Sequence, residues 1–344
     1  MYDQLIVVED GVIISINPSR AGDIKPDHSC HYIAPSFIDL QIYGARGKLF
    51  SMYPSPDTLQ AMYEHCLEGG TGCFLATIAT NTNEVICKSI DAVRDYWRRG
   101  GKGLAGLHLE GPWINPLKRG AHIEAFIKTP DVEDVFRLLE YGHEVIKMIT
   151  LAPEICNIDV IKLINSYDIN ISAGHSNATF AEASACFSNG VRAVTHLYNA
   201  MSTFHHRGTG LPGATFEDAM AMSSIIVDGY HADFSAIRIA KKIMGDRLYL
   251  ITDAVTETKE GPYQHSFHEG RYLSNNTLSG SALTMAKAVK NCANHCDIPA
   301  AEALRMASLY PARLMNMQGG RLAINEKASF ILMDESLNLI SNCI

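Results

Sequence analysis

The feature that most constrains this chain is a series of short apolar runs separated by longer stretches with helical periodicity. Runs of this kind are typical of parallel strands that are buried on both faces of a sheet. A series of eight favours an α/β fold of the (β/α)8 TIM-barrel type, with an open doubly wound sheet as the alternative. No G-x-G-x-x-G motif follows the first run to support that alternative. The eight runs are Phe37–Gln41, Cys73–Ile78, Leu104–Leu109, Val145–Thr150, Ile169–Ala173, Val191–Thr195, Ser223–Val227 and Leu248–Thr252.

Helical stretches follow or separate most of these runs. Their apolar residues recur at the spacing expected of helices that cover a barrel from outside. This alternation predicts the strand–helix order of a barrel along the middle of the chain. The predicted helices are Asp57–Glu68, Asn83–Arg99, Asp131–Tyr141, Ile158–Ser166, Phe180–Asn189 and Ala232–Met244.

The two ends of the chain differ from the middle. Leu5–Val8 and Val12–Ile16 are apolar and flank an acidic turn with glycine, which predicts a hairpin. Short β-prone runs return at Ala328–Met333 and Leu337–Ile340. A chain of 344 residues has room for a barrel and a small β domain built from both ends. The expected boundaries are 1–35 with 321–344 for the small domain and 36–320 for the barrel.

Composition excludes several classes of partner. With 29 Lys and Arg against 37 Asp and Glu, the net charge of −8 argues against nucleic acid and against an anionic membrane surface. No apolar run reaches the length of about 18 residues that a membrane span needs. The segment Met1–Gln4 lacks the basic start of a signal peptide, and the nine cysteines form no CxxC pair. We therefore expect a cytoplasmic protein with reduced thiols.

Side chains capable of metal binding or acid–base chemistry stand at the ends of six runs. In a parallel barrel the carboxyl ends of the strands meet at one face, where active sites are built. Chance accounts for one or two polar residues there, but six make a coherent set. They are Gln41, Glu110, His175, His196, His231 and Asp253.

Glu110, His175 and His196 together predict a metal site. One carboxylate and two imidazoles leave a fourth position for water, which is the composition of a catalytic zinc site. Asp253 could then exchange a proton with that water and with a leaving group. Taken singly, each residue has a plainer interpretation: a loop glutamate, a hydrogen-bonded histidine or a helix N-cap. His122 lies in a loop and could polarise a carbonyl.

A basic loop follows His196. Arg207, with the backbone of Asn199 and Ala200, could bind a phosphate group, although a solvated loop is the plainer interpretation. Leu278–Ser281 is predicted to be a Gly-Ser turn that offers backbone groups to a ligand or caps the next helix.

These segments form an ordered set of motifs that resembles a known family. From about Asp10 onward the chain resembles the N-acetylglucosamine-6-phosphate deacetylases of the amidohydrolase superfamily. Each motif alone is weak, but all of them in order are specific. The motifs are His108–Trp113, Ala173–Ser176, Thr195–Met201, Asp228–His231, Thr252–Ala254 and Leu278–Ser281.

The resemblance implies a barrel with a small β-sandwich, a homodimer, and hydrolysis of the acetamide of a phosphorylated N-acetyl-hexosamine to acetate and an amino sugar. It implies one divalent ion, expected to be zinc, on Glu110, His175 and His196. It makes Asp253 the catalytic acid and base and places His122 at the acetamido group. Arg207 is implied to reach across the dimer into the partner's site. The implied substrate-binding residues are Ala121, Asn199, Ala200, Arg207, His231, Leu278, Ser279 and Gly280.

Two departures from the pattern matter. Many amidohydrolases carry His-x-His after the first strand, whereas this chain has Gln41-Ile42-Tyr43, which predicts one metal rather than two. Both ends are short, so we expect an abbreviated sandwich. A galacto epimer of the substrate and a cyclic amide stay open as alternatives. A barrel without chemistry is disfavoured, because all four residues proposed for the reaction are present.

Overall fold

The computed structural model describes residues 4–20 and 25–343. Positions 1–3, 21–24 and 344 lie outside the described residues. These positions include parts of the predicted small domain. They also include most of Met1–Gln4, the segment on which the signal-peptide prediction rests. Eight parallel strands form one sheet in which chain neighbours are also spatial neighbours, and the predicted barrel is confirmed. Each predicted run coincides with one strand. The strands are β4 (Phe37–Ile42), β7 (Thr71–Ala79), β8 (Leu104–Glu110), β9 (Ile146–Leu151), β10 (Asn170–Ala173), β11 (Ala193–Val194), β12 (Met222–Ile225) and β13 (Leu248–Leu250).

The barrel closes between β4 and the segment that follows β13. The Asp253 backbone N–H donates to the Gln41 carbonyl, with 2.9 Å between nitrogen and oxygen, and Tyr43 N–H donates to the Ala254 carbonyl at 2.9 Å. Both contacts lie beyond the end of β13, at the carboxyl edge of the sheet. Closure therefore fixes the backbone where the strand ends carry their polar side chains.

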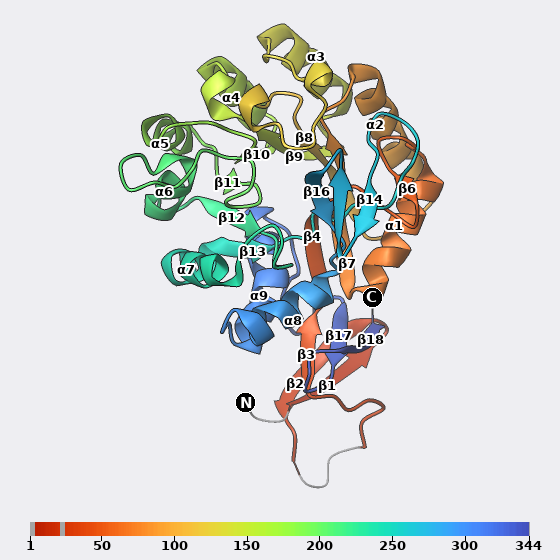
Figure 1. Cartoon of the computed structure of the whole chain (residues 1–344). Helices are drawn as coiled ribbons and strands as arrows, with labels where there is room; N and C mark the ends of the chain where they lie inside the picture. Colours follow the sequence, from red (N-terminus) through yellow and green to blue (C-terminus); the bar gives the residue numbers. More distant parts are fainter. Residues whose placement is uncertain (1–3, 21–24, 344) are drawn as a thin grey trace.

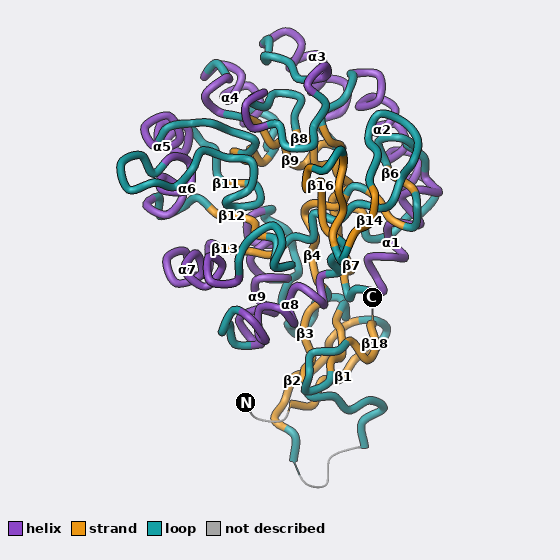
Figure 2. Tube along the Cα trace, viewed as in Figure 1, coloured by secondary structure: helices purple, strands orange, loops and turns teal. Residues whose placement is uncertain are grey.

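Helices surround the strands, as the purple and orange segments of Figure 2 show. The six predicted helices form within two residues of their expected ends, and side-chain caps define several starts. At α5, Thr179 and Glu182 form a reciprocal capping box. No helix in the described ranges is long and apolar enough to cross a bilayer. These helices are α1 (Pro56–Glu68), α2 (Asn83–Arg98), α3 (Val132–Gly142), α4 (Ile158–Asn165), α5 (Phe180–Ser188) and α7 (Phe234–Met244). The described residues also form α6 (Gly210–Glu217), α8 (Met285–His295), α9 (Ala300–Ala307) and α10 (Leu309–Leu314).

Strands from both ends of the chain lie together below the barrel in Figure 1. The hairpin contacts the C-terminal segment through Ile13 N–H to the Glu326 carbonyl at 3.0 Å and Ala328 N–H to the Gly11 carbonyl at 2.8 Å. These contacts support the small domain, while its boundaries at 1–35 and 321–344 stay a prediction. The strands are the hairpin β1 (Gln4–Glu9) and β2 (Val12–Pro18), and a sheet of β3 (Tyr32–Pro35), β17 (Phe330–Met333) and β18 (Leu339–Cys343).

A three-stranded antiparallel sheet lies over the carboxyl edge of the barrel. It corrects the prediction of a turn at Leu278–Ser281, because these residues form most of a strand. Ser281 N–H donates to the Asp253 carbonyl at 2.9 Å, so the strand pairs with the seam of the barrel. Gly280, at φ 130°, has room for no side chain, because a Cβ there would lie 2.6 Å from Val255 Cγ1. The strands are β14 (Ser266–His268), β15 (Arg271–Ser274) and β16 (Thr277–Ser281), next to a short pair, β5 (Gly44–Ala45) and β6 (Lys48–Leu49).

Candidate active site

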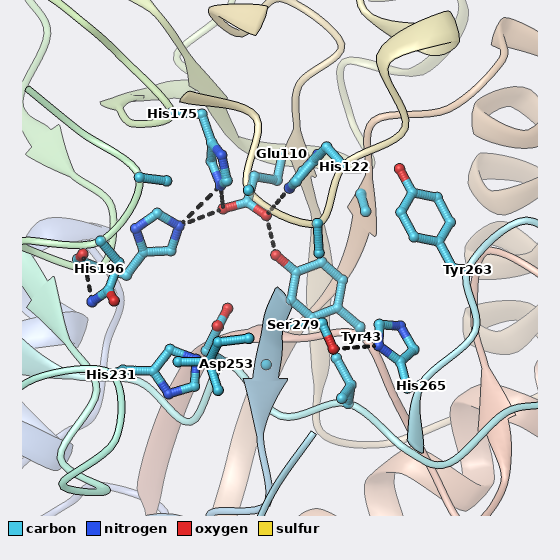
Figure 3. A pocket seen from close by; sticks show the side chains of 18 of the residues that line it. Tyr43, Glu110, His122, His175, His196, His231, Asp253, Tyr263, His265 and Ser279 are labelled. Carbon is cyan, nitrogen blue, oxygen red and sulfur yellow. Dashed lines mark hydrogen bonds and ion pairs between the residues drawn. The ribbon is translucent and has the colours of Figure 1, made fainter. Parts of the chain in front are cut away.

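A pocket of about 270 Å³ opens at the carboxyl ends of the barrel strands. Every predicted site residue except Arg207 lines it, because the strand ends and the overlying β16 bring them to one place. Figure 3 shows the charged and aromatic side chains converging on its interior. The predicted residues found there are Glu110, Ala121, His122, His175, His196, Asn199, Ala200, His231, Asp253, Leu278, Ser279 and Gly280.

Three of the central residues have left-handed backbone conformations. The φ angle is 46° at His175, 36° at His196 and 53° at Asp253. Residues other than glycine adopt this region rarely and at a cost, and such residues gather where a side chain must be aimed. Neighbouring groups hold the turns: the His196 N–H, for example, donates to Ser224 Oγ at 2.7 Å.

The side chains of Glu110, His175 and His196 meet at one point. Glu110 Oε1 lies 3.1 Å from His196 Nε2 and 3.3 Å from His175 Nε2. The two Nε2 atoms are 3.1 Å apart. All three side chains are buried. Burial by itself would raise the pKa of Glu110, but the three histidines around it outweigh burial and hold that pKa well below its usual range.

Hydrogen bonds fix the proton positions on two of these histidines. His175 Nδ1 lies 2.9 Å from the Lys118 carbonyl oxygen, which only accepts, so Nδ1 carries the proton and Nε2 has a free lone pair. His122 has the opposite arrangement. The Thr80 N–H donates to His122 Nδ1 at 3.2 Å, so Nε2 carries the proton, 3.1 Å from Glu110 Oε2. Burial lowers the pKa of His122 to about 4, which keeps this ring neutral.

These proton positions separate two possible sets of metal ligands. Donor atoms of Glu110, His122 and His175 lie within 4.8 Å of one another and could surround an ion. The Nε2 of His122, however, is a hydrogen-bond donor and not a free lone pair. His196 fits better, because its Nε2 faces Glu110 Oε1 and His175 Nε2 at 3.1 Å. Its buried Nδ1 has no hydrogen-bond partner in the described part of the chain, so no contact there prevents Nε2 from being the acceptor. With the His196 proton on Nδ1, Glu110 Oε1 and the two Nε2 atoms are three mutually facing acceptors, an arrangement that fits a metal ion.

Gln41 was predicted at a strand end, but its role as a hydrogen-bond donor to two carboxyl groups was not. Its amide nitrogen lies 3.0 Å from Glu110 Oε1 and 2.7 Å from Asp253 Oδ1, so it donates toward both carboxyl groups. The hydroxyl of Tyr43 also hydrogen-bonds Glu110. Burial, followed by the nearby charge of Glu110, raises the pKa of Asp253 well above its usual range. Asp253 therefore takes up a proton more readily than an ordinary carboxyl does, beside the metal-binding group.

Other pocket residues were missed. Tyr43 lies two positions after Gln41, so a period-two reading of β4 continued past its end could have found it. Tyr263 and His265 belong to the segment around β14, which has no strand-end signal. Tyr263 donates to the Thr80 carbonyl at 2.6 Å, and His265 Nδ1 lies 2.9 Å from Ser279 Oγ. Both side chains wall the pocket on the side away from His231 in Figure 3.

His231 is held by a buried carboxylate. Its Nδ1 lies 2.6 Å from Asp228 Oδ2, and the backbone N–H groups of Tyr230 and His231 donate to Asp228 Oδ1 at 2.8 Å. Burial would raise the pKa of Asp228, but the His231 side chain outweighs burial and lowers it. Asp228 therefore occupies Nδ1 of His231, a residue that lines the pocket, and leaves the other ring nitrogen, Nε2, free for a further contact.

Arg207 lies outside the pocket. It is exposed, in a loop where its N–H donates to His205 Nδ1 at 3.3 Å. The basic residues His205, His206 and Arg207 therefore do not line the pocket of their own chain. The predicted role of Arg207 needs a second copy of the chain.

The barrel and its buried glutamate–histidine cluster define a class, the metal-dependent hydrolases built on a (β/α)8 barrel. The chain belongs to the amidohydrolase family, whose profile matches residues 32–342. Among its relatives is N-acetylglucosamine-6-phosphate deacetylase of Haemophilus influenzae, 35% identical, with 95% of this chain and 89% of the relative covered. N-acetylgalactosamine-6-phosphate deacetylase of Escherichia coli O157:H7 is 29% identical, with 98% and 92% covered. The crystal structure of N-acetylglucosamine-6-phosphate deacetylase from Pasteurella multocida matches with a TM-score of 0.92 and 31% identity, covering 100% of this chain and 94% of the other.

Proposed function

We propose that this protein hydrolyses the acetamide of N-acetyl-D-glucosamine 6-phosphate to glucosamine 6-phosphate and acetate, in amino-sugar breakdown in the cytoplasm. The observation that carries the proposal is the meeting of Glu110, His175 and His196 beside Asp253 in a chain related to deacetylases of this name. A binding protein would not need a buried carboxyl that shares an amide donor with the metal-binding glutamate.

One divalent ion, zinc, is proposed on Glu110, His175 and His196. A divalent ion in such a site supplies Lewis acidity toward a water molecule and a carbonyl oxygen. Gln41 supports a single ion, because its amide nitrogen donates where a second cation would need an acceptor.

The protein side chains then divide the proton transfers. Asp253 takes a proton from the attacking water and returns it to the departing nitrogen, which becomes an amine. His122, with its proton on Nε2, donates toward the developing charge on the carbonyl oxygen. Thr80 maintains that direction, because its N–H occupies the other ring nitrogen.

The sugar phosphate is proposed to bind along the wall of the pocket that is lined by Asn199, Ala200 and His231. Arg207 of a second subunit completes the phosphate site in a homodimer. The exposure of Arg207 on a loop supports this assignment. Remote binding of this kind holds the amide at the reacting groups. The sugar would lie between Ala121 and the strip of Leu278, Ser279 and Gly280.

Acetate release from the two epimers tests the function. We expect turnover of N-acetylglucosamine 6-phosphate, weaker turnover of N-acetylgalactosamine 6-phosphate, and little of the sugar without phosphate. The galacto activity is the second candidate, favoured by the likeness to the Escherichia coli O157:H7 relative. No acetate from either epimer with zinc-loaded protein would contradict the proposal.

Asp228→Asn should raise KM about tenfold and leave kcat within a few-fold of wild type. The change removes a charge-assisted hydrogen bond worth about 1.5 kcal/mol, which corresponds to a factor of about ten. Steady-state kinetics measure the split. Asp233→Asn is the matched control, because Asp233 caps the nearby helix α7 and is exposed. Equal KM values for Asp228→Asn and wild type would remove Asp228 from substrate binding.

A further inference from the structure

Four buried polar side chains form a connected series inside the barrel, beneath the pocket. His108 lies on β8, Thr150 on β9 and Ser172 on β10, and Thr195 directly follows β11. Consecutive polar atoms are 2.7, 2.7 and 2.6 Å apart, and each residue is at most 2% exposed. None of the four lines the pocket, and the proposed mechanism gives none of them a role. We call this series the hydroxyl chain.

The hydrogen bonds of the hydroxyl chain run in one direction. His108 Nδ1 lies 2.9 Å from the Leu40 carbonyl oxygen, which only accepts, so Nδ1 carries the proton. All the hydrogen-bond partners of the buried ring are uncharged, which favours its neutral form with Nε2 as an acceptor. Thr150 must then donate to Nε2. Since its single proton is used, Thr150 accepts from Thr195, which in turn accepts from Ser172.

The hydroxyl chain connects the strands that carry the proposed metal ligands. Each ligand follows a member of the chain by one to three residues. Gly174, the residue before one of them, rests directly on the series: a Cβ there would lie 2.7 Å from Thr150 Cγ2 and 2.8 Å from Thr195 Cβ. The ligand pairs are His108 with Glu110, Ser172 with His175, and Thr195 with His196.

We propose that the hydroxyl chain positions the three metal ligands by fixing how far each strand is offset from its neighbour. Thr150 and Thr195 each donate one hydrogen bond and accept one, and Ser172 donates the last, so the series forms completely only when the strands stand in a single register. Its members are positioning residues, since none of them lines the pocket. The inference rests on the proposed function, because it assumes that Glu110, His175 and His196 bind an ion.

Thr150→Val tests the proposal, because valine keeps the shape and removes the central hydroxyl. His108 then loses its donor and Thr195 its acceptor. We expect the zinc dissociation constant, measured by competition with a chromogenic chelator, to rise about tenfold. Removing a group that orients metal ligands typically weakens metal binding by at least that factor. Thr150→Ser should restore the wild-type value. Thr215→Val is the matched control: Thr215 is equally buried, on α6, and donates to the Leu211 carbonyl at 2.8 Å.

A lower Tm for Thr215→Val with wild-type zinc affinity would show that a lost buried hydroxyl alone does not weaken the metal site. Wild-type zinc affinity in Thr150→Val would overturn the proposal. If Thr150→Val does not fold, Ser172→Ala removes only the last donor, and the same titration should show a smaller rise; an unchanged value there also overturns the proposal. Wild-type protein that binds no zinc would instead contradict the proposed function.

Discussion

Asp253→Asn should lower kcat about 10³-fold and leave the zinc content unchanged. Asparagine can still accept the hydrogen bond from Gln41, which is 2.7 Å in the native protein, so the geometry around Glu110 should persist. It cannot take up a proton, so neither the attacking water nor the departing nitrogen has its proton carrier. Steady-state kinetics and elemental analysis of the same preparation measure the two quantities.

The metal content is the control for this substitution. A variant that loses both zinc and turnover would show that Asp253 helps to hold the ion, and the acid–base role would need another residue. Near-normal turnover with bound zinc would exclude Asp253 as the proton carrier.

Glu110→Gln should abolish zinc binding and with it the activity. Glu110 is the one carboxylate at the meeting point of His175 and His196, and its charge is what makes the cluster attractive to a divalent cation. An amide supplies no charge. Gln41 and Tyr43 donate to both oxygens of Glu110, and an amide has only one oxygen to accept from them. We expect the zinc content to fall from about one ion per chain to near zero and kcat to fall at least about 10³-fold.

Asp39→Asn is the matched control for Glu110→Gln. Asp39 is another buried carboxyl of the barrel; it accepts from Thr252 N–H at 3.2 Å and does not line the pocket. Its variant should lose stability and keep zinc. Full zinc occupancy in Glu110→Gln would disprove the ligand assignment. Wild-type protein treated with a chelator should be inactive until zinc is returned. This experiment tests the metal requirement without a substitution.

The barrel and most of the pocket could be predicted because their signals are local. A run such as Leu104–Leu109 marks a buried strand by its own composition, and Glu110 directly after it lies at the strand end by geometry alone. The helix α5 begins where Thr179 and Glu182 form a capping box. Each of these features depends on residues a few positions apart.

What could not be predicted depends on contacts between distant segments. The proton on His175 is fixed by the Lys118 carbonyl, and the one on His122 by the Thr80 N–H, neither of which leaves a pattern in the sequence. The amide of Gln41 matters only because Glu110 and Asp253 fold around it. For the same reason a glycine–serine segment looked like a turn: the strand β16 exists because β15, and at Ser281 the barrel seam, provide its partners.

That seam links the strand that covers the pocket to the proposed proton carrier, Asp253. The Asp253 N–H is bound to Gln41 of the first barrel strand, and its carbonyl accepts from Ser281 of β16. Val255 N–H then returns to the Ser281 carbonyl at 3.2 Å. Lifting β16 to widen the entrance would break the bonds that hold Asp253 in its left-handed conformation. If Asp253 is the proton carrier, access and reactivity are coupled: we expect a substrate to enter while β16 stays paired, because moving β16 would displace the carboxyl.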